Sequence, residues 1–584
     1  MKNSFQIELF PDEILLEIYQ YLHCGHVLYS FYNLNLRLNR TIINYCQYVI
    51  LRRLTYQQFR HLYSNILPKI GHCIRSLTIN RLQQQEFLEN FTLNIKNIFP
   101  NLEILAIDDW KNVDLFPFIN NHLTKLEYLR RIIIRGLRKS IEVNSFVNII
   151  DDYNQLLEMI SKNPQIETIL FEPDCYSMTL FNTKKLSTIY SNLIQINLSL
   201  STSNDLLYFA FLFPTIRRVN VIIEELLPIE QDIIPFQCLT HFSLDTINSP
   251  SKLESVLIIF QLIPTVEYLS LVLLTEDDRL VYGKDLLCNT LSLKSFQYAV
   301  YFSSSVNYSF DPQEFLKSWK SLQIIYTINK DQKKTYILIH TVPYPSILLN
   351  LQSISSNKFG AKERDQVYNC IQYLYITQVK NLKETFSILQ HCRKIQDLTI
   401  QIDENESIRS VPSNSEFTPF IVKLKRLKIL SVSGLVDNWY HFKQLILSAD
   451  NLSTLCLDVQ CAIKLFEIDD KEIFFPGVIH LFLDGRKTNV KFTSEHIYQL
   501  ARIFNRIHSL KIKYRNDDII EGKTLGEILD YCKHLIVFSM NGQLSENIPT
   551  DDLSQWLMQH SFRLKKLEKN YQIQLIDDSI QIWL

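Results

Sequence analysis

One spacing of apolar residues recurs along most of the chain: an apolar residue, two other positions, a second apolar residue, one position and a third. Two apolar residues separated by one position point to the same side of a β-strand, so each copy predicts a short strand with one buried face. The residue three positions before that pair is expected to close the turn that enters the strand. The copies are Ile74/Leu77/Ile79, Leu102/Leu105/Ile107, Leu129/Ile132/Ile134, Ile166/Ile169/Phe171, Leu193/Ile196/Leu198, Ile216/Val219/Val221, Leu239/Phe242/Leu244, Val266/Leu269/Leu271, Leu293/Phe296/Tyr298, Ile371/Leu374/Ile376, Ile395/Leu398/Ile400, Leu427/Leu430/Val432, Leu452/Leu455/Leu457, Val478/Leu481/Leu483, Ile507/Leu510/Ile512 and Leu535/Phe538/Met540.

Most copies begin 23 to 29 residues after the one before, and helical spacing fills the intervals, as at Leu156/Leu157/Ile160, Leu253/Val256/Leu257/Phe260 and Leu525/Ile528/Leu529. A strand and a helix repeated at this period are typical of a solenoid. A helix is about 10 Å wide, whereas neighbouring strands lie about 4.8 Å apart, so stacked units should curve with the strands inside. An all-helical solenoid is the alternative, but it would need apolar residues at i, i+3 and i+4 instead of i, i+3 and i+5.

This pattern resembles leucine-rich repeats over roughly residues 70–570. The resemblance implies an α/β fold in which parallel strands line the inside of a curved solenoid and helices cover the outside. The chain departs from the family three positions after the last apolar residue, where leucine-rich repeats usually carry Asn or Cys. These positions here include Trp110, Asp174, Glu224, Ile247, Gln460 and Arg486. The repeats are therefore divergent, and other groups must satisfy the backbone of their turns.

The repeat pattern breaks between about residues 300 and 370. Segments 323–329 and 335–340 are rich in Ile, Tyr and Thr and flank a charged stretch, which predicts a β-hairpin. Residues 353–364 are polar and predict a loop. We expect an insertion, or a seam between two blocks of repeats, at 321–370. The chain ends in an apolar stretch, Ser579–Leu584, which predicts a strand that covers the last open edge of the array.

The amino-terminal segment predicts three short helices. Pro11 suits a first helical turn, and Asp12 and Glu13 favour the positive end of the helix dipole. An apolar stripe follows, and Gly25 is expected to end the first helix. A second amphipathic stretch spans residues 27–38, and a third spans 42–54. Three short helices have little interior of their own, so their apolar surface is expected to contact another protein. The stripe of the first helix comprises Ile14, Leu15, Ile18 and Leu22.

This segment resembles an F-box, the motif that binds the Skp-type adaptor of cullin-based ubiquitin ligases. The match covers Phe10-Pro11-Asp12-Glu13-Ile14-Leu15, then Ile18 and Leu22, and Phe31-Tyr32-Asn33-Leu34-Asn35. Three departures stand out: Phe10 replaces the usual Leu, His26-Val27 replaces an acidic residue followed by Leu, and a late Trp is missing. The resemblance implies that the adaptor, and through it a cullin, binds Phe10, Pro11, Ile14, Leu15, Ile18, Leu22, Phe31 and Leu34.

The sequence thus predicts four regions: an F-box-like helical module at 5–50, a first block of repeats at 51–320, the irregular segment at 321–370, and a second block at 371–584 with its closing segment. The expected function is that of a substrate receptor, a subunit that holds a protein substrate for ubiquitin transfer by other subunits, with the chain a monomer within the complex. A scaffold outside any ligase, in which the first helices only cap the repeats, is the alternative.

Charge and composition narrow the partners. The 584 residues include 46% hydrophobic side chains and carry a formal net charge of −1, which argues against nucleic-acid binding through a general basic face. Apolar runs are far shorter than the roughly 20 residues that cross a bilayer, and no secretory signal is seen, so no membrane partner is expected. The eleven scattered cysteines show no C-x-x-C spacing and predict reduced thiols in a cytoplasmic or nuclear protein.

Motifs for catalysis, cofactors and metals are weak. Gly522-Lys523-Thr524 is similar to the end of a phosphate-binding loop, but Asp517 stands where that loop needs glycine. The Cys and His residues do not form two closely spaced pairs, as zinc sites require. We therefore expect no catalytic residue, cofactor or metal. A cysteine hydrolase stays open as an alternative, because a Cys–His pair can meet in the fold alone.

Residues that alternate with the buried pair of each strand would point into the hollow of a curved array. Their charges are mixed in sign, which suits selective contact with a protein segment. The expected substrate-binding residues are Arg131, Arg218, His241, Tyr268, Asp458, His480 and Lys511.

Overall fold

The computed structural model shows an α/β protein with two large, mostly parallel mixed sheets. It describes residues 10–584 except 52–53, 91–94, 138–157, 159, 180–191, 228–232, 247–248, 288–292, 306–307, 320–321, 323, 331–333, 347, 353–367, 369, 380–381, 403–422, 435, 437–438, 468–473, 487–491, 516–517, 545–552, 568–569 and 577–578. The chain forms two compact units, one of Met1–Leu54 with Gln58–Pro345 and one of Thr55–Gln57 with Ser346–Leu584, and each holds one of the two large sheets.

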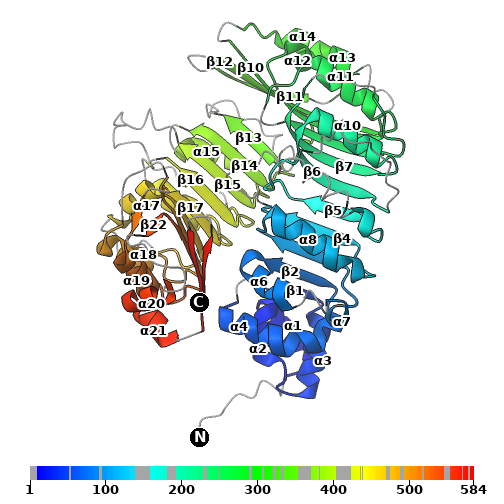
Figure 1. The fold of residues 1–584 in the computed structure, drawn as a ribbon. Helices are drawn as coiled ribbons and strands as arrows, with labels where there is room; N and C mark the ends of the chain where they lie inside the picture. The colour runs from blue at the N-terminus through cyan, green and yellow to red at the C-terminus, as the bar shows by residue number, and fades with distance from the viewer. Residues whose placement is uncertain are drawn as a thin grey trace. The chain divides into compact units, whose positions relative to one another are not determined.

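The first unit contains a twelve-stranded sheet whose first ten strands are parallel and follow chain order (Figure 1). The order ends β10-β12-β11, with β12 antiparallel to both neighbours. The strands are β1 (Tyr48–Ile50), β2 (Ser76–Asn80), β3 (Ile104–Asp108), β4 (Arg131–Arg135), β5 (Thr168–Phe171), β6 (Gln195–Thr202), β7 (Arg218–Glu225), β8 (His241–Thr246), β9 (Tyr268–Thr275), β10 (Ser295–Ser305), β11 (Ile324–Lys330) and β12 (Lys334–Thr341).

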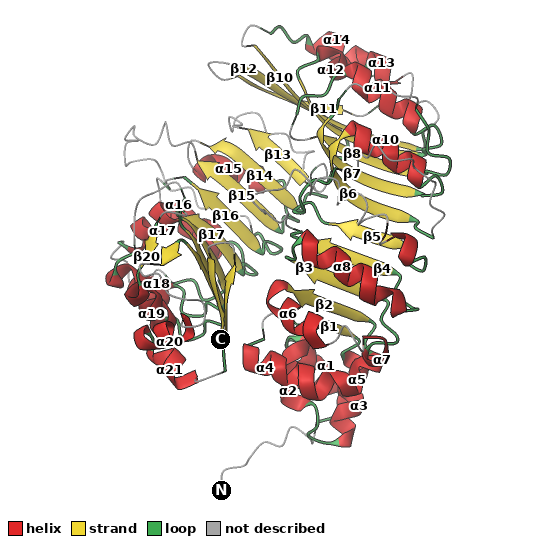
Figure 2. Cartoon of the chain, in the orientation of Figure 1, coloured by secondary structure: helices red, strands yellow, loops and turns green. Residues whose placement is uncertain are grey.

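The helices of the first unit include three at its amino terminus and others between successive strands. Helices α8, α10 and α11 lie on one side of the sheet (Figure 2). The helices are α1 (Asp12–Gln20), α2 (Cys24–Phe31), α3 (Leu36–Tyr45), α4 (Tyr56–His61, whose first two residues belong to the second unit), α5 (Leu67–Ile70), α6 (Arg81–Asn90), α7 (Ile95–Ile98), α8 (Asn112–His122), α10 (Ser203–Leu212), α11 (Leu253–Leu262), α12 (Asp278–Tyr282), α13 (Lys284–Leu287) and α14 (Pro312–Ser318).

The second unit contains a ten-stranded sheet of the order β13-β14-β15-β16-β17-β18-β19-β21-β24-β23, in which β24 is antiparallel to β21 and β23. Strands β20 (Ile519–Ile520) and β22 (Gln543–Leu544) pair separately. The sheet strands are β13 (Leu348–Gln352), β14 (Tyr373–Val379), β15 (Asp397–Ile402), β16 (Ile429–Ser433), β17 (Thr454–Asp458), β18 (His480–Asp484), β19 (Ser509–Lys513), β21 (Val537–Asn541), β23 (Gln572–Ile576) and β24 (Ser579–Trp583). The helices are α15 (Leu382–Leu389), α16 (Trp439–Leu447), α17 (Val459–Phe466), α18 (Ser494–Ile503), α19 (Gly522–Tyr531), α20 (Leu553–His560) and α21 (Phe562–Leu567).

All sixteen apolar copies predicted from the sequence form strands, and their middle positions align across each sheet. A slip of one residue would turn the apolar side chains to the other face, so this alignment keeps the buried ladder continuous. In the first sheet the ladder runs through Leu77, Leu105, Ile132, Ile169, Ile196, Val219, Phe242, Leu269 and Phe296. In the second it runs through Leu374, Leu398, Leu430, Leu455, Leu481, Leu510 and Phe538.

A tight turn enters most of these strands as expected. The backbone N–H of Ile216 donates to the carbonyl of Phe213 at 3.3 Å, and Ile507 repeats this with Phe504 at 3.2 Å. Phe213 and Phe504 are both 1% exposed. The repeat therefore contains a further buried position, three residues before the first apolar residue of the spacing.

Carboxylates satisfy some of the turns that lack the usual Asn. Asp174, one of the divergent positions, accepts a hydrogen bond of 3.0 Å from the backbone N–H of Gly136, whose φ is +59°. Asp458 accepts one of 2.7 Å from the N–H of Gly434. The divergent position Ile247 lies outside the described residues.

Several local expectations differ from the structure. The prediction of a third helix over 42–54 is wrong after Tyr45, where α3 ends, because residues 48–50 form β1, which pairs with β2. Gly25 lies inside α2 instead of ending α1, and a Cβ atom there would meet Leu54 Cδ2 at 2.9 Å. The absence of a side chain thus lets α2 approach Leu54 closely.

The central segment 321–370 contains the predicted hairpin, β11 and β12, which forms the end of the first sheet. The division between the units falls after Pro345, and β13 already belongs to the second sheet. The predicted loop at 353–364 and the helical residues 156–157 lie outside the described residues. The predicted closing strand forms as β24, but the edge of the sheet is β23, which was not expected.

Candidate functional site

The amino-terminal helices share an interior built by one side of α1. Leu15 and Tyr19 are both 0% exposed. The Tyr19 ring packs against Phe31 and Tyr45, with centroids 5.4 and 5.6 Å away, and the Tyr45 hydroxyl donates to the Tyr19 carbonyl at 2.8 Å. Burial raises the pKa of the Tyr19 hydroxyl. Leu15 therefore stabilises the module itself and does not lie on a surface that a partner could contact, contrary to its expected role.

The other side of α1 exposes an apolar stripe. Ile14, Ile18, Tyr21 and Leu22 lie at i, i+4, i+7 and i+8, the spacing of one helical face. Ile14 is 45% exposed, Leu22 39% and Tyr21, just after the last helical residue, 86%, whereas Ile18 is half-buried. The sequence pattern did not single out Tyr21, because it selected the more continuous stripe that includes Leu15.

Two further leucines extend this apolar surface. Leu34 is 53% exposed and Leu36, the first residue of α3, is 79% exposed. The Arg37 guanidinium ties this corner to the start of α1: it donates to the carbonyl of Phe10 and lies 3.4 Å from an Asp12 carboxylate oxygen. Pro11 is exposed, whereas Phe10 and Phe31 are half-buried. We call Ile14, Ile18, Tyr21, Leu22, Leu34 and Leu36 the amino-terminal apolar surface.

The face of the first sheet opposite the buried ladder carries many polar side chains together with some apolar ones, and we call it the first polar face. Four predicted substrate-binding residues, Arg131, Arg218, His241 and Tyr268, occupy the same row of this face, each at the first position of its strand. Arg218, His241 and Tyr268 are direct neighbours in that row, whereas Thr168 and Gln195 separate Arg131 from Arg218.

His241 and Tyr268 form a stacked pair. Their ring centroids are 4.4 Å apart with an interplanar angle of 13°, and Tyr268 is 40% exposed. The His241 Nδ1 lies 2.9 Å from the Thr240 hydroxyl. Burial and the neighbouring Arg218 lower the pKa of the imidazole, so it is mainly neutral at pH 7. Arg131 and Arg218 make no ion pair with any residue that the structure describes.

The three predicted residues of the second unit are not brought together in the same way. Asp458, His480 and Lys511 come from adjacent strands but from three different rows. Because Asp458 binds the backbone of Gly434, its role is structural. The Nζ atoms of Lys511 and Lys513 lie 5.7 and 5.4 Å from the ring centroid of Phe482, an arrangement suited to cation–π attraction.

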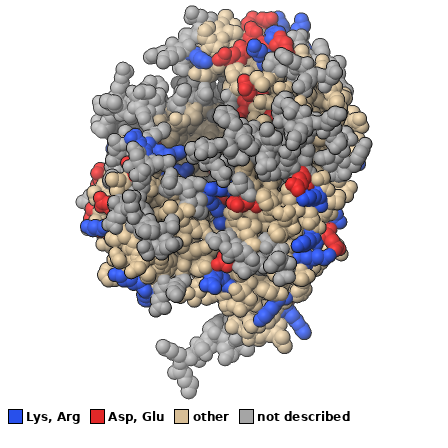
Figure 3. Space-filling model, in the orientation of Figure 1, with Lys and Arg blue, Asp and Glu red and all other residues tan. Residues whose placement is uncertain are grey.

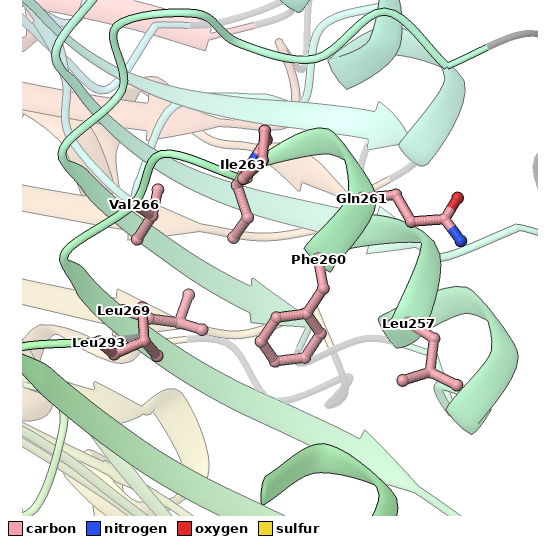
Figure 4. A pocket seen from close by; sticks show the side chains of 8 residues that line it. Leu257, Phe260, Gln261, Ile263, Val266, Leu269 and Leu293 are labelled. Atoms are coloured by element: carbon pink, nitrogen blue, oxygen red, sulfur yellow. The ribbon is translucent and has the colours of Figure 1, made fainter. Parts of the chain in front are cut away.

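A pocket lined mainly by apolar side chains lies between α11 and β9 in the first unit. Its volume is about 310 Å³, and Figure 4 shows Phe260 projecting from α11 toward Leu269 and Leu293 while Gln261 points away. Leu257, Ile263, Pro264 and Val266 complete its described lining. None of these eight residues is charged, so the pocket offers packing but little chemistry.

The residues that could suggest catalysis or metal binding lie in packed surroundings. At Gly522, a Cβ atom would meet Trp556 at 2.6 Å and His560 at 2.9 Å, so these side chains occupy the space beside the start of α19. Burial raises the pKa of the Cys461 and Cys532 thiols to about 12, which opposes thiolate formation. Among the described residues, no group of three or more His, Cys, Asp or Glu side chains could hold a metal ion.

Charges of both signs are interspersed on the face drawn in Figure 3. Among the described residues, no helix is both long and apolar enough to cross a membrane. Comparison with known proteins gives no assignment: no protein-family model matches the chain, and no curated protein is similar to it.

Proposed function

We propose that this protein is an F-box and leucine-rich-repeat substrate receptor of a cullin-based ubiquitin ligase. The amino-terminal module binds a Skp-type adaptor, and the strand repeats hold a protein substrate. Other subunits perform the transfer, so the contribution of this chain is proximity: a tethered substrate presents its lysines at a high effective concentration.

The amino-terminal apolar surface is the observation that carries the proposal. Five of its members are between 39% and 86% exposed, although each is large and apolar: Ile14, Tyr21, Leu22, Leu34 and Leu36. A cap that only shields the end of a sheet would turn such side chains inward. Burying one large apolar side chain contributes about 1.5–3 kcal/mol, so a partner that covers several of them would bind stably.

The repeats support the second part of the proposal. Parallel strands in chain order, a buried ladder in constant register and a turn before most strands are all features of leucine-rich repeats. Carboxylates such as Asp174 supply the turn hydrogen bonds that the usual Asn would make. We accordingly propose that each sheet is a divergent leucine-rich-repeat array.

The test is affinity purification of the full chain with Ile14→Asp and Leu22→Asp combined. Both side chains are partly exposed, so the variant should fold, whereas a substitution of Leu15 would disrupt the interior. Two buried charges in the interface should reduce recovery of the adaptor and the cullin at least tenfold.

Leu447→Asp is the matched control, because Leu447 is 62% exposed on α16 of the second unit. It should leave adaptor recovery unchanged. Undiminished recovery with the double variant would contradict the docking surface. Recovery of other proteins by the wild-type chain, with neither adaptor nor cullin, would identify a scaffold instead.

A further inference from the structure

Asp245 occupies an unusual place on the first polar face. It belongs to β8, and its neighbours in the same row are Ile222 on β7 and Val272 on β9. Its Oδ1 atom is buried and accepts no hydrogen bond. A carboxylate between two β-branched apolar side chains is poorly hydrated, and this burial raises the pKa of Asp245 to about 7.

These surroundings match the shape of a lysine or arginine side chain. The aliphatic part of such a side chain packs on apolar groups while its charged head seeks an anion. Ile222, which is half-buried, can contact the aliphatic part, and the Asp245 carboxylate can pair with the head. Val272 is 5% exposed and packs within the protein. A paired charge also removes the desolvation cost that the lone carboxylate bears.

A stripe of uncharged hydrogen-bonding side chains runs beside this position. Asn197, Asn220, Ser243, Ser270 and Gln297 form one row across strands β6 to β10, two residues from the row of Asp245. The Asn220 Nδ2 donates to the Asn197 Oδ1 at 3.0 Å. The Ser270 hydroxyl already donates to the carbonyl of Pro345 at 3.5 Å, so the peptide is expected over the part of the row on β6 to β8. Amides and hydroxyls both donate and accept, as the backbone of an extended peptide requires.

The spacing of this row suits an extended peptide that crosses the strands. Neighbouring strands lie about 4.8 Å apart, so two steps cover roughly 9.6 Å, whereas three extended residues cover about 10 Å. The stacked His241 and Tyr268 rings flank the row on its other side. They provide a flat apolar contact for one peptide side chain.

We infer that the first polar face binds an extended peptide segment whose lysine or arginine side chain pairs with Asp245. The inference names the class of substrate for the proposed function and rests on that function for the fate of the bound protein. Binding itself requires only the first sheet.

The experiment uses the purified full-length chain and three pools of random nonapeptides with a fixed central residue: lysine, norleucine or glutamate. Norleucine keeps the aliphatic part of lysine without its charge. The wild-type chain should retain the lysine pool at least tenfold better than the norleucine pool and should retain the glutamate pool least. In Asp245→Asn, which keeps the shape of the side chain, the lysine preference should fall to about twofold or less.

Asp450→Asn is the matched control, because Asp450 is exposed in a turn of the second unit. It should keep the full lysine preference. Tyr268→Ala, at an exposed position, should weaken retention of all pools without changing their order. Equal retention of the lysine and norleucine pools by the wild type, or an unchanged lysine preference in Asp245→Asn, would overturn the inference.

The amino-terminal variant separates this inference from the proposed function. Ile14→Asp with Leu22→Asp should retain the lysine pool as the wild type does. Peptide binding without adaptor recovery would leave the inference standing and refute the ligase assignment, and the reverse result would refute the inference alone.

Discussion

The two sheets end in the same way, although one end lies in mid-chain and the other at the carboxyl terminus. After a run of parallel strands, β10 pairs with β12 and β12 with β11, just as β21 pairs with β24 and β24 with β23. In both cases the chain makes the edge strand first and then returns between it and the parallel run. Each hairpin thus forms the last two strands of its own sheet, and the mid-chain hairpin lies at the end of a unit.

The two hairpins differ in what supports them. Before the first, Trp319 is 2% exposed, and its indole N–H donates to the Val281 carbonyl at 2.9 Å. Gly283, with φ +63°, leaves room for that ring, because a Cβ atom there would lie 2.0 Å from it. Before the second, Arg563 donates to the carbonyls of Cys532 at 2.8 Å and Leu535 at 2.6 Å. A buried aromatic ring and a half-buried guanidinium thus occupy equivalent positions before the two hairpins.

The largest expected effect comes from placing a charge in either inner strand. Ile337 of β12 and Ile580 of β24 are each 1% exposed. Ile337→Asp and Ile580→Asp should each lower the free energy of unfolding of their own unit by about 4 kcal/mol or more, because the carboxylate would be buried without a partner. Limited proteolysis with mass spectrometry should show loss of protection in 58–345 for the first variant and in 346–584 for the second.

The controls are Ile337→Val and Ile580→Val, which should cost only about 0.5–1.5 kcal/mol. Loss of protection in both units with either aspartate variant would contradict the division of the chain into two units that unfold separately.

The strands could be predicted because the spacing that defines them is local. Each copy places two apolar residues on one strand face, and the register follows from the need to keep the ladder buried. Two strands of the parallel runs, β1 and β13, were not predicted because a residue other than the expected apolar one stands at the first position of the spacing. In β1 the first apolar position is taken by Cys46, before Val49 and Leu51, and before β13 it is taken by Ser346. A search that allowed Cys or Ser there would have found both.

The side chains that matter for function depend on neighbours distant in sequence. Ile14 and Leu15 are equivalent on an isolated helix, and only the placement of Phe31 and Tyr45 beside Tyr19 decides which side is buried. The surroundings of Asp245 likewise depend on distant residues, because the register of the sheet places Ile222 and Val272 beside it. Residue spacing therefore predicts which face of an element is apolar, but not what covers it.

The next largest effect is expected from removing Trp319 or Arg563, the side chains that precede the two hairpins. Trp319→Ala should lower the stability of the first unit by about 3–5 kcal/mol, the usual cost of removing a buried aromatic side chain. Arg563→Ala should lower that of the second unit by about 2–3 kcal/mol, because the carbonyls of Cys532 and Leu535 would lose a charged donor. Urea unfolding monitored for each unit by hydrogen exchange measures both.

Arg563→Lys should recover only part of the loss, since an ammonium lacks the planar fork that reaches both carbonyls. Lys565→Ala is the control, because Lys565 lies over the exposed ring of Phe562 and should change stability by less than about 0.5 kcal/mol. An Arg563→Ala variant as stable as this control would show that packing alone holds α21 in place.

The smallest effect is expected in the pH dependence of stability, from one buried carboxyl group on each sheet. Burial raises the pKa of Asp245 to about 7 and that of Asp397, in β15, to about 6. A raised pKa means that the carboxyl group keeps its proton to higher pH in the folded state than in the unfolded state. The burial of this group therefore costs no stability below about pH 4, and its cost grows as the pH rises to the folded pKa. Asp245→Asn and Asp397→Asn remove the ionisable group and with it the loss of stability at high pH. Each should match the wild type at pH 4 and exceed it at pH 8.

One pKa unit corresponds to about 1.4 kcal/mol, and both residues are partly accessible to water, so we expect gains at pH 8 of about 1–2 kcal/mol. The gain should be larger for Asp245→Asn and should continue to grow up to about pH 7, whereas the gain for Asp397→Asn should level off near pH 6. Urea unfolding at pH 4, 6, 7 and 8 distinguishes the two profiles. Gains that are independent of pH would show that the amide changes packing and that neither carboxylate is destabilised by its burial.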